Sequence, residues 1–157
     1  MDAAAARARL DEASAAIVAG VEQVLPRWVK SRVAFIADAW GRLDPDARAD
    51  LDARARRAGV EATARVVSEL RVLFAVDAAT QRSTPLEVVR SATGEVTALL
   101  AGVGIPPVER DPFDERAFPD DVYGVTPSSL ADLGEPDLGP LQLAWGLAKT
   151  QVLRADL

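Results

Sequence analysis

The sequence predicts an all-α fold: a helical bundle of four to five main helices, with an irregular, acidic, proline-rich segment and short C-terminal helices. Three observations lead to this prediction. Apolar residues recur at spacings of three and four along residues 1–104, which is the period of a helix with one buried face. Pairs of Asp or Thr followed by Pro occur where helices would begin. No run alternates apolar and polar residues with the period of two that a half-buried strand shows.

We expect a single domain over residues 1–157. It would consist of a helical core at 1–104, an irregular acidic segment at 105–140, and a C-terminal helix at 141–155 that packs back on the bundle. Residues 1–104 carry 14 basic and 14 acidic side chains, whereas the remaining residues carry 4 and 10 and so hold the whole net charge of −6. Seven of the ten prolines also lie beyond residue 104, which places the boundary there.

The first helix is predicted from about Asp2 to Leu25, because its apolar residues return to one face. Pro26 then either bends this helix or opens a second one, since proline fits the first turn of a helix. Helical spacing continues after Pro26 as far as Leu43. The three tryptophans are interpreted mainly as core residues: Trp28, Trp40 and Trp145.

The next helix is predicted to start at Asp44-Pro45-Asp46, which combines an Asp cap, a proline in the first turn and an acid near the helix N-terminus. Gly59 would end it, as glycine often does. The following stretch, Val60 to Asp77, is rich in large apolar residues and is the predicted central core helix.

Three more helix starts are predicted along the rest of the chain. Thr84-Pro85-Leu86-Glu87 fits a capping box, and the helix it opens would end at the glycines from Gly102 onward. Thr126-Pro127 would start a short helix that runs through Leu133. Gly139-Pro140 would start the last helix, which is apolar enough to pack on another chain.

The composition excludes several kinds of chemistry. The chain has no Cys and no His, so disulfides, zinc–thiolate sites, thiol nucleophiles and Ser–His pairs are impossible. A glycine-rich phosphate loop is also absent from the sequence. We therefore expect a protein that is not an enzyme, with no catalytic residue, no cofactor and no metal site. Paired carboxylates could still perform acid–base chemistry, which sequence spacing alone does not reveal.

Residues 55–67 resemble the helix-turn-helix of DNA-binding repressors, with Gly59 at the turn. The family's pattern places a buried aliphatic residue six positions after this glycine, where the chain has Arg65. The second helix would also present Glu61 and Glu69 to the phosphates. Because phosphate contacts dominate DNA affinity, nucleic acid is a disfavoured partner.

The segment from residue 108 onward combines acids, aromatics and irregular backbone, and long loops of this kind often carry function. Two interpretations are compatible: a strap whose aromatic side chains dock on the helices, and a surface that binds a partner. The spacing of its acids lacks the alternation and the turn glycine of a Ca²⁺ loop. The predicted partner-binding residues are Arg110, Asp111, Phe113, Asp114, Glu115, Arg116, Phe118, Asp120, Asp121 and Tyr123.

Four stretches within residues 105–150 resemble an uncharacterised protein family of high-GC actinobacteria. They are Asp111-Pro112-Phe113, 118–123, 129–133 and Trp145-Gly146-Leu147-Ala148-Lys149. The resemblance implies an intracellular protein and brings no activity, cofactor or catalytic residue with it.

Taken together, these features predict a non-enzymatic soluble interaction or regulatory module that uses residues 108–133 as its partner surface. The main alternative is a helical protein that binds a small apolar or cationic ligand, and the third hypothesis is a helix-turn-helix DNA regulator. The expected partner is another protein, or a second copy of the chain that forms a homodimer through an apolar helix face. The sequence shows neither a secretory signal nor a membrane span, so the expected location is the cytoplasm.

Overall fold

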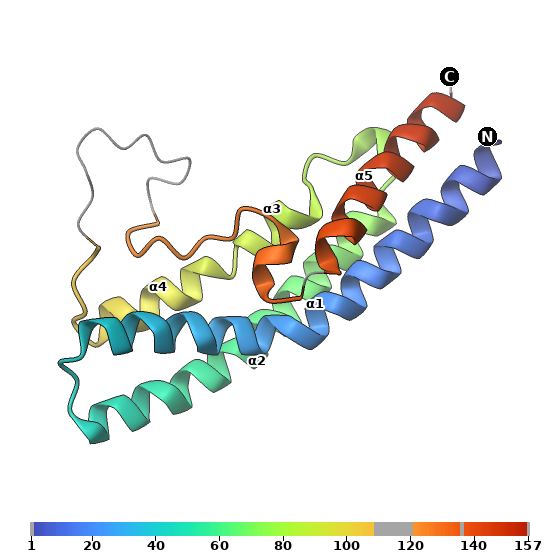
Figure 1. The fold of residues 1–157 in the computed structure, drawn as a ribbon. Helices are drawn as coiled ribbons and strands as arrows, with labels where there is room; N and C mark the ends of the chain where they lie inside the picture. Colours follow the sequence, from blue (N-terminus) through green and yellow to red (C-terminus); the bar gives the residue numbers. More distant parts are fainter. Residues whose placement is uncertain (1, 109–120, 136, 157) are drawn as a thin grey trace, which may run out of the picture.

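The computed structural model describes residues 2–108, 121–135 and 137–156, and these residues form an all-α helical bundle as predicted (Figure 1). The two long helices come first, and three shorter ones follow. The α-helices are α1 (Ala3–Trp40), α2 (Pro45–Ala75), α3 (Pro85–Arg90), α4 (Thr93–Gly102) and α5 (Leu138–Ala155). Two 3₁₀ turns, η1 (Ala78–Thr80) and η2 (Leu130–Leu133), lie in the connections.

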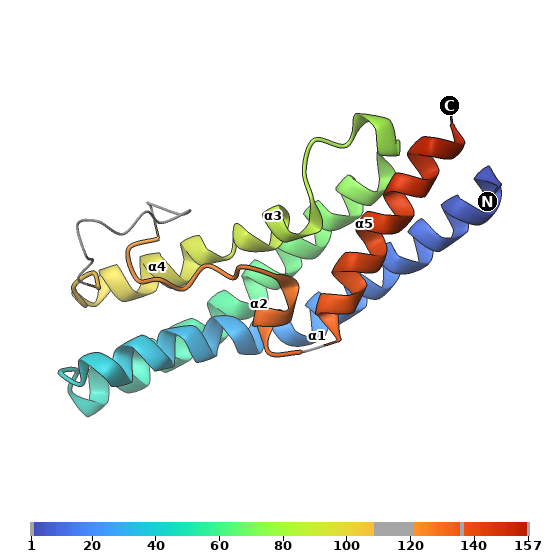
Figure 2. The same cartoon turned by 45° about the horizontal axis from the view of Figure 1, so that its top comes forward.

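Helices α1 and α2 form a long antiparallel hairpin that organises the rest of the molecule (Figure 1). Helix α5 packs along the N-terminal half of α1, so both chain ends lie at the same end of the bundle (Figure 2). Helix α4 packs against α1 and α2 toward the other end. The core is continuous across these contacts; its fully buried large side chains include Ile17, Leu25, Leu51, Leu70, Leu100, Leu130 and Leu138.

Pro26 lies inside α1 and does not open a second helix. The helix changes direction near its middle (Figure 1), as expected where proline removes one backbone hydrogen bond and its ring crowds the preceding turn. The helix ends at Trp40, and Gly41 caps it: its φ of 65° is left-handed, and its N–H donates to the Ala37 carbonyl at 2.9 Å. The alternative of a single bent helix is therefore confirmed.

The predicted helix end at Gly59 is wrong, because α2 continues through this residue to Ala75. Gly59 is buried, and a Cβ atom built on it would lie 2.8 Å from the carbonyl oxygen of Pro26. The glycine thus allows two helix backbones to approach closely where α1 and α2 pack together. Since residues 45–75 form one helix without a turn, the helix-turn-helix interpretation of residues 55–67 is also wrong.

Capping side chains mark two of the predicted helix starts, and the structure confirms both. Asp44 caps α2 by accepting from the Ala47 N–H at 2.9 Å, and Thr84 caps α3 by accepting from the Glu87 N–H at 3.3 Å.

The single helix predicted after Thr84 is divided into α3 and α4 by a turn that begins at Ser91. The predicted start at Thr126-Pro127 is wrong, because η2 begins only after Ser129, its N-cap. The last helix begins at Leu138, next to the predicted start.

Candidate functional site

The structure describes two of the ten residues predicted to bind a partner, Asp121 and Tyr123. The other eight lie outside the described residues: Arg110, Asp111, Phe113, Asp114, Glu115, Arg116, Phe118 and Asp120. Both described side chains are buried, with exposed fractions of 8% for Asp121 and 3% for Tyr123. Their surroundings show how the end of the acidic segment is attached to the bundle.

Tyr123 ties the chain after the acidic stretch to the chain before it, at Ile105. Its hydroxyl donates to the carbonyl of Ile105 at 2.6 Å, in a buried hydrogen bond. Nearby, the N–H of Val108 donates to the carbonyl of Val122 at 3.0 Å, so the two ends of the segment meet. Burial raises the pKa of the Tyr123 phenol above its ordinary value near 10.

Asp121 organises the chain that follows it. Its carboxylate accepts from the N–H of Val125 at 3.0 Å and from the N–H of Thr126 at 2.7 Å. These bonds satisfy two backbone donors in a loop that has no helix to satisfy them. Arg90 of α3 then donates to the carbonyls of Pro127 at 3.0 Å and Ser128 at 3.4 Å, which ties the loop to the bundle. The described end of the segment is therefore a docked strap, and partner binding by its remaining residues stays a prediction.

Replacing Tyr123 by phenylalanine should loosen this strap at small cost to the rest of the bundle. The substitution leaves the Ile105 carbonyl without its donor, which costs about 1–3 kcal/mol for a buried group. We expect faster limited proteolysis between residues 105 and 125, and a lower free energy of unfolding in urea. Faster cleavage confined to the helices instead would contradict the anchoring role.

The same tyrosine predicts a pH dependence. A pKa that is raised in the folded state means that the neutral phenol is the form that folding favours. The stabilising contribution is therefore fully present below the unfolded-state pKa of about 10, and is lost as the pH rises through the folded-state value. Wild-type protein should lose stability above pH 10 more steeply than the Tyr123→Phe variant, as equilibrium unfolding at increasing pH would show.

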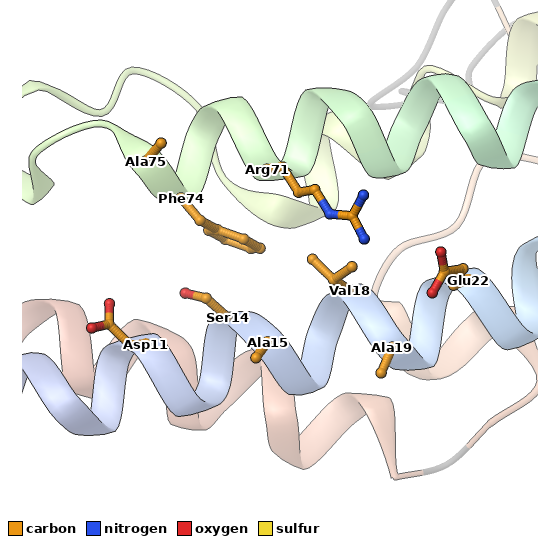
Figure 3. A pocket seen from close by; sticks show the side chains of 9 residues that line it. All are labelled: Asp11, Ser14, Ala15, Val18, Ala19, Glu22, Arg71, Phe74 and Ala75. Atoms are coloured by element: carbon orange, nitrogen blue, oxygen red, sulfur yellow. The ribbon is translucent and has the colours of Figure 1, made fainter.

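A groove lies between α1 and α2, along the N-terminal half of α1 (Figure 3). Its volume is about 540 Å³, and it opens to solvent along its length. Small side chains on both helices leave the space, while Val18 and the half-buried ring of Phe74 give it an apolar surface. The lining residues are Asp11, Ser14, Ala15, Val18, Ala19, Glu22, Arg71, Phe74 and Ala75.

Charges of both signs border this groove. Asp11 and Glu22 lie toward opposite ends of its α1 side, and Arg71 reaches across from α2 toward Val18 (Figure 3). Within the described part of the chain, none of the three makes an ion pair within 4 Å. The groove therefore combines two carboxylates and one guanidinium with the apolar surface of Val18 and Phe74.

The hydroxyl group that lines the groove is not a free nucleophile. This hydroxyl, that of Ser14, donates to the carbonyl of Leu10 at 2.8 Å and accepts from the Trp145 indole N–H at 3.1 Å. Ser14 is also only 7% exposed. Because the hydroxyl is buried and already hydrogen-bonded on both sides, it is not available to attack a molecule in the groove.

The sequence alone indicates only one wall of this groove. Asp11, Ala15, Val18 and Glu22 follow helical spacing and therefore share one face of α1. The opposite wall comes from α2, and the erroneous helix end at Gly59 concealed that α2 runs antiparallel to α1 over this length.

Three further results concern metal sites, membrane helices and similarity to known proteins. Among residues 2–108, 121–135 and 137–156, no group of three or more acidic side chains is placed to hold a metal ion. None of the described helices combines the length and the apolar character needed to cross a membrane. Comparisons with models of protein families, with curated proteins and with solved structures found no match to this chain.

Proposed function

We propose that this chain is a non-enzymatic protein-interaction module of the cytoplasm, and that it binds its partner through the acidic aromatic segment 108–133. The observation that supports the proposal is that the stretch 108–122 of this segment is closed at its base, through the Val108–Val122 and Tyr123–Ile105 hydrogen bonds. Between these bonds the sequence places Phe113 and Phe118 among acids that outnumber the arginines by five to two in residues 109–120. A basic partner surface with room for an aromatic side chain fits this composition.

The test compares two sets of substitutions by crosslinking and pull-down from cells of the source organism. Phe113→Ala with Phe118→Ala, and separately Asp111→Asn with Asp114→Asn and Glu115→Gln, should each reduce capture of the specific partner at least about tenfold. Tyr123 is kept in both because it anchors the strap. Phe35→Ala is the matched control, since Phe35 is 61% exposed on α1, and it should retain the partner. Unchanged capture by both folded segment variants would refute the proposal.

A second candidate function is the binding of a small apolar or cationic ligand in the groove between α1 and α2. Its volume of about 540 Å³ lies in the usual range for ligand sites. Its two carboxylates outnumber the one guanidinium of Arg71, so together with Phe74 they suit an amphiphilic cation. Titration with an alkyltrimethylammonium probe, followed by NMR shifts, tests this candidate. Binding should weaken in Asp11→Asn and Glu22→Gln. Shifts spread evenly over the surface would indicate nonspecific binding.

A further inference from the structure

The outer face of α5 carries a ridge of two exposed leucines. Leu143 is 66% exposed and Leu147 is 58% exposed, although leucines in the core such as Leu138 are almost fully buried. The two residues are four apart, so they lie one turn from each other on the same side of the helix. Two neighbouring exposed leucines form an apolar patch larger than a single scattered surface residue.

Hollows flank this ridge on both sides. One has a volume of about 450 Å³ and lies between α1 and α5, where Ala13, Ala16, Ala144 and Ala148 line it. The other, of about 480 Å³, lies along the opposite side of α5, beside Gly139 and Gly146. Leu147 borders both hollows. A ridge of large side chains beside grooves lined by small ones is the surface relief with which helices pack together.

We propose that this face binds the same face of a second copy of the chain, in an isologous dimer. In such a pair, residues that form the ridge on one protomer enter the groove of the other, and the reverse contact follows by symmetry. This face has both the ridge and the groove: Leu143 and Leu147 form the ridge, and the alanine-lined hollow between α1 and α5 can receive leucine side chains.

The charges on this face also favour a second copy over a strongly charged partner. The polar side chains that α5 contributes to the two hollows are neutral: Gln142, Thr150 and Gln151. None of the three brings a charge to this face, and two are already hydrogen-bonded within the chain: Gln142 accepts from the Leu130 N–H at 2.8 Å, and Thr150 donates to the Gly146 carbonyl at 3.0 Å. The charged residues at the rim, Arg9 and Glu12 of α1, have opposite signs. Like charges would repel when a face meets itself, and this face does not concentrate them.

Electrostatics further select an antiparallel arrangement of the two α5 helices. The midpoint of the ridge is residue 145; Asp137 lies eight residues before it and Arg154 nine residues after it. Both side chains are exposed. An antiparallel pair centred on the ridge brings Arg154 of each protomer near Asp137 of the other, whereas a parallel pair would bring like charges together. The opposed helix dipoles favour the same orientation.

Sedimentation analysis of the full chain between about 5 and 500 µM tests the proposal. This range suits a weak to moderate dimer, which is what a small interface around two leucines gives. Wild-type protein should dimerise with rising concentration, and Leu143→Gln with Leu147→Gln should raise the dimer Kd by at least about 100-fold. Helical circular dichroism should be unchanged, because both leucines are exposed. The matched control is Val72→Gln, at a residue 65% exposed on α2, which should leave the dimer intact.

Exchanging the two charges distinguishes a specific dimer from nonspecific hydrophobic association. Arg154→Asp should weaken the dimer about tenfold or less, and adding Asp137→Arg should restore it. A wild-type chain that stays monomeric, or a dimer that persists in the leucine variant, would overturn the proposal. Failure of the charge exchange alone would overturn the antiparallel orientation. These results are independent of the acidic segment, since no substitution here touches residues 108–133.

Discussion

Replacing Gly59 by alanine should lower the free energy of unfolding by about 1–3 kcal/mol, and replacing it by valine should lower it further. The new Cβ would lie 2.8 Å from the carbonyl oxygen and 3.2 Å from the Cα of Pro26. Both are backbone atoms of α1, so the contact can be relieved only by moving one long helix away from the other. This loss exceeds the gain of about 1 kcal/mol that alanine normally brings to a helix interior. Equilibrium denaturation in urea, with helical circular dichroism as the signal, measures the difference.

Two other glycines provide controls for this experiment. Gly94 lies in α4, and a Cβ added to it would have no atom within 4 Å, so Gly94→Ala should be neutral or stabilising by up to about 1 kcal/mol. Gly20 is intermediate, because its Cβ would meet the end of the Leu138 side chain and not a backbone. An equal effect of alanine at Gly59 and at Gly94 would show that the close approach of α1 and α2 is not what requires the glycine.

Local signals predicted where helices begin, because the capping group and the N–H that it accepts from are three residues apart. Asp44 and Thr84 are the clearest examples. The meaning of Gly59 depends on Pro26, which is 33 residues away and whose position against Gly59 is set by the packing of α1 on α2. A glycine that ends a helix and a glycine that admits a neighbour look the same in a sequence.

The same difference between local contacts and contacts distant in sequence determines which functional surfaces the sequence predicts. The docking of the segment's aromatic residues was one of two interpretations, and Tyr123 bears it out within the described residues. The role of Asp121 as an acceptor for backbone N–H groups depends on the fold of the loop after it, which its charge alone does not indicate. The groove between α1 and α2 and the relief around Leu147 are made jointly by two helices, so periodicity within either helix shows only half of each.

Replacing Trp145 by alanine should destabilise the protein by about 3–5 kcal/mol, a large share of the stability of an ordinary domain. The residue is 4% exposed and joins three helices at one point. From α5, its indole N–H donates to the Ser14 hydroxyl of α1 at 3.1 Å, and its ring centre lies 5.9 Å from that of Phe74 in α2. Truncation would leave a cavity at the only aromatic contact that the described residues show between α5 and α2. Urea denaturation, read by circular dichroism, gives the loss of stability.

Trp145→Phe separates the hydrogen bond from the packing. Phenylalanine keeps most of the ring but cannot donate, so this variant should lose less stability than alanine does, with about 1 kcal/mol of the loss due to the hydrogen bond. A double-mutant cycle with Ser14→Ala should then give a coupling of about 0.5–1.5 kcal/mol. The same cycle with Ser91→Ala should be additive, because Ser91 bonds to Arg65 and to the Val88 carbonyl, far from Trp145. Additivity in both cycles would mean that Trp145 holds α5 by apolar contact alone. The Ser14 hydroxyl would then serve only its own helix, through the carbonyl of Leu10.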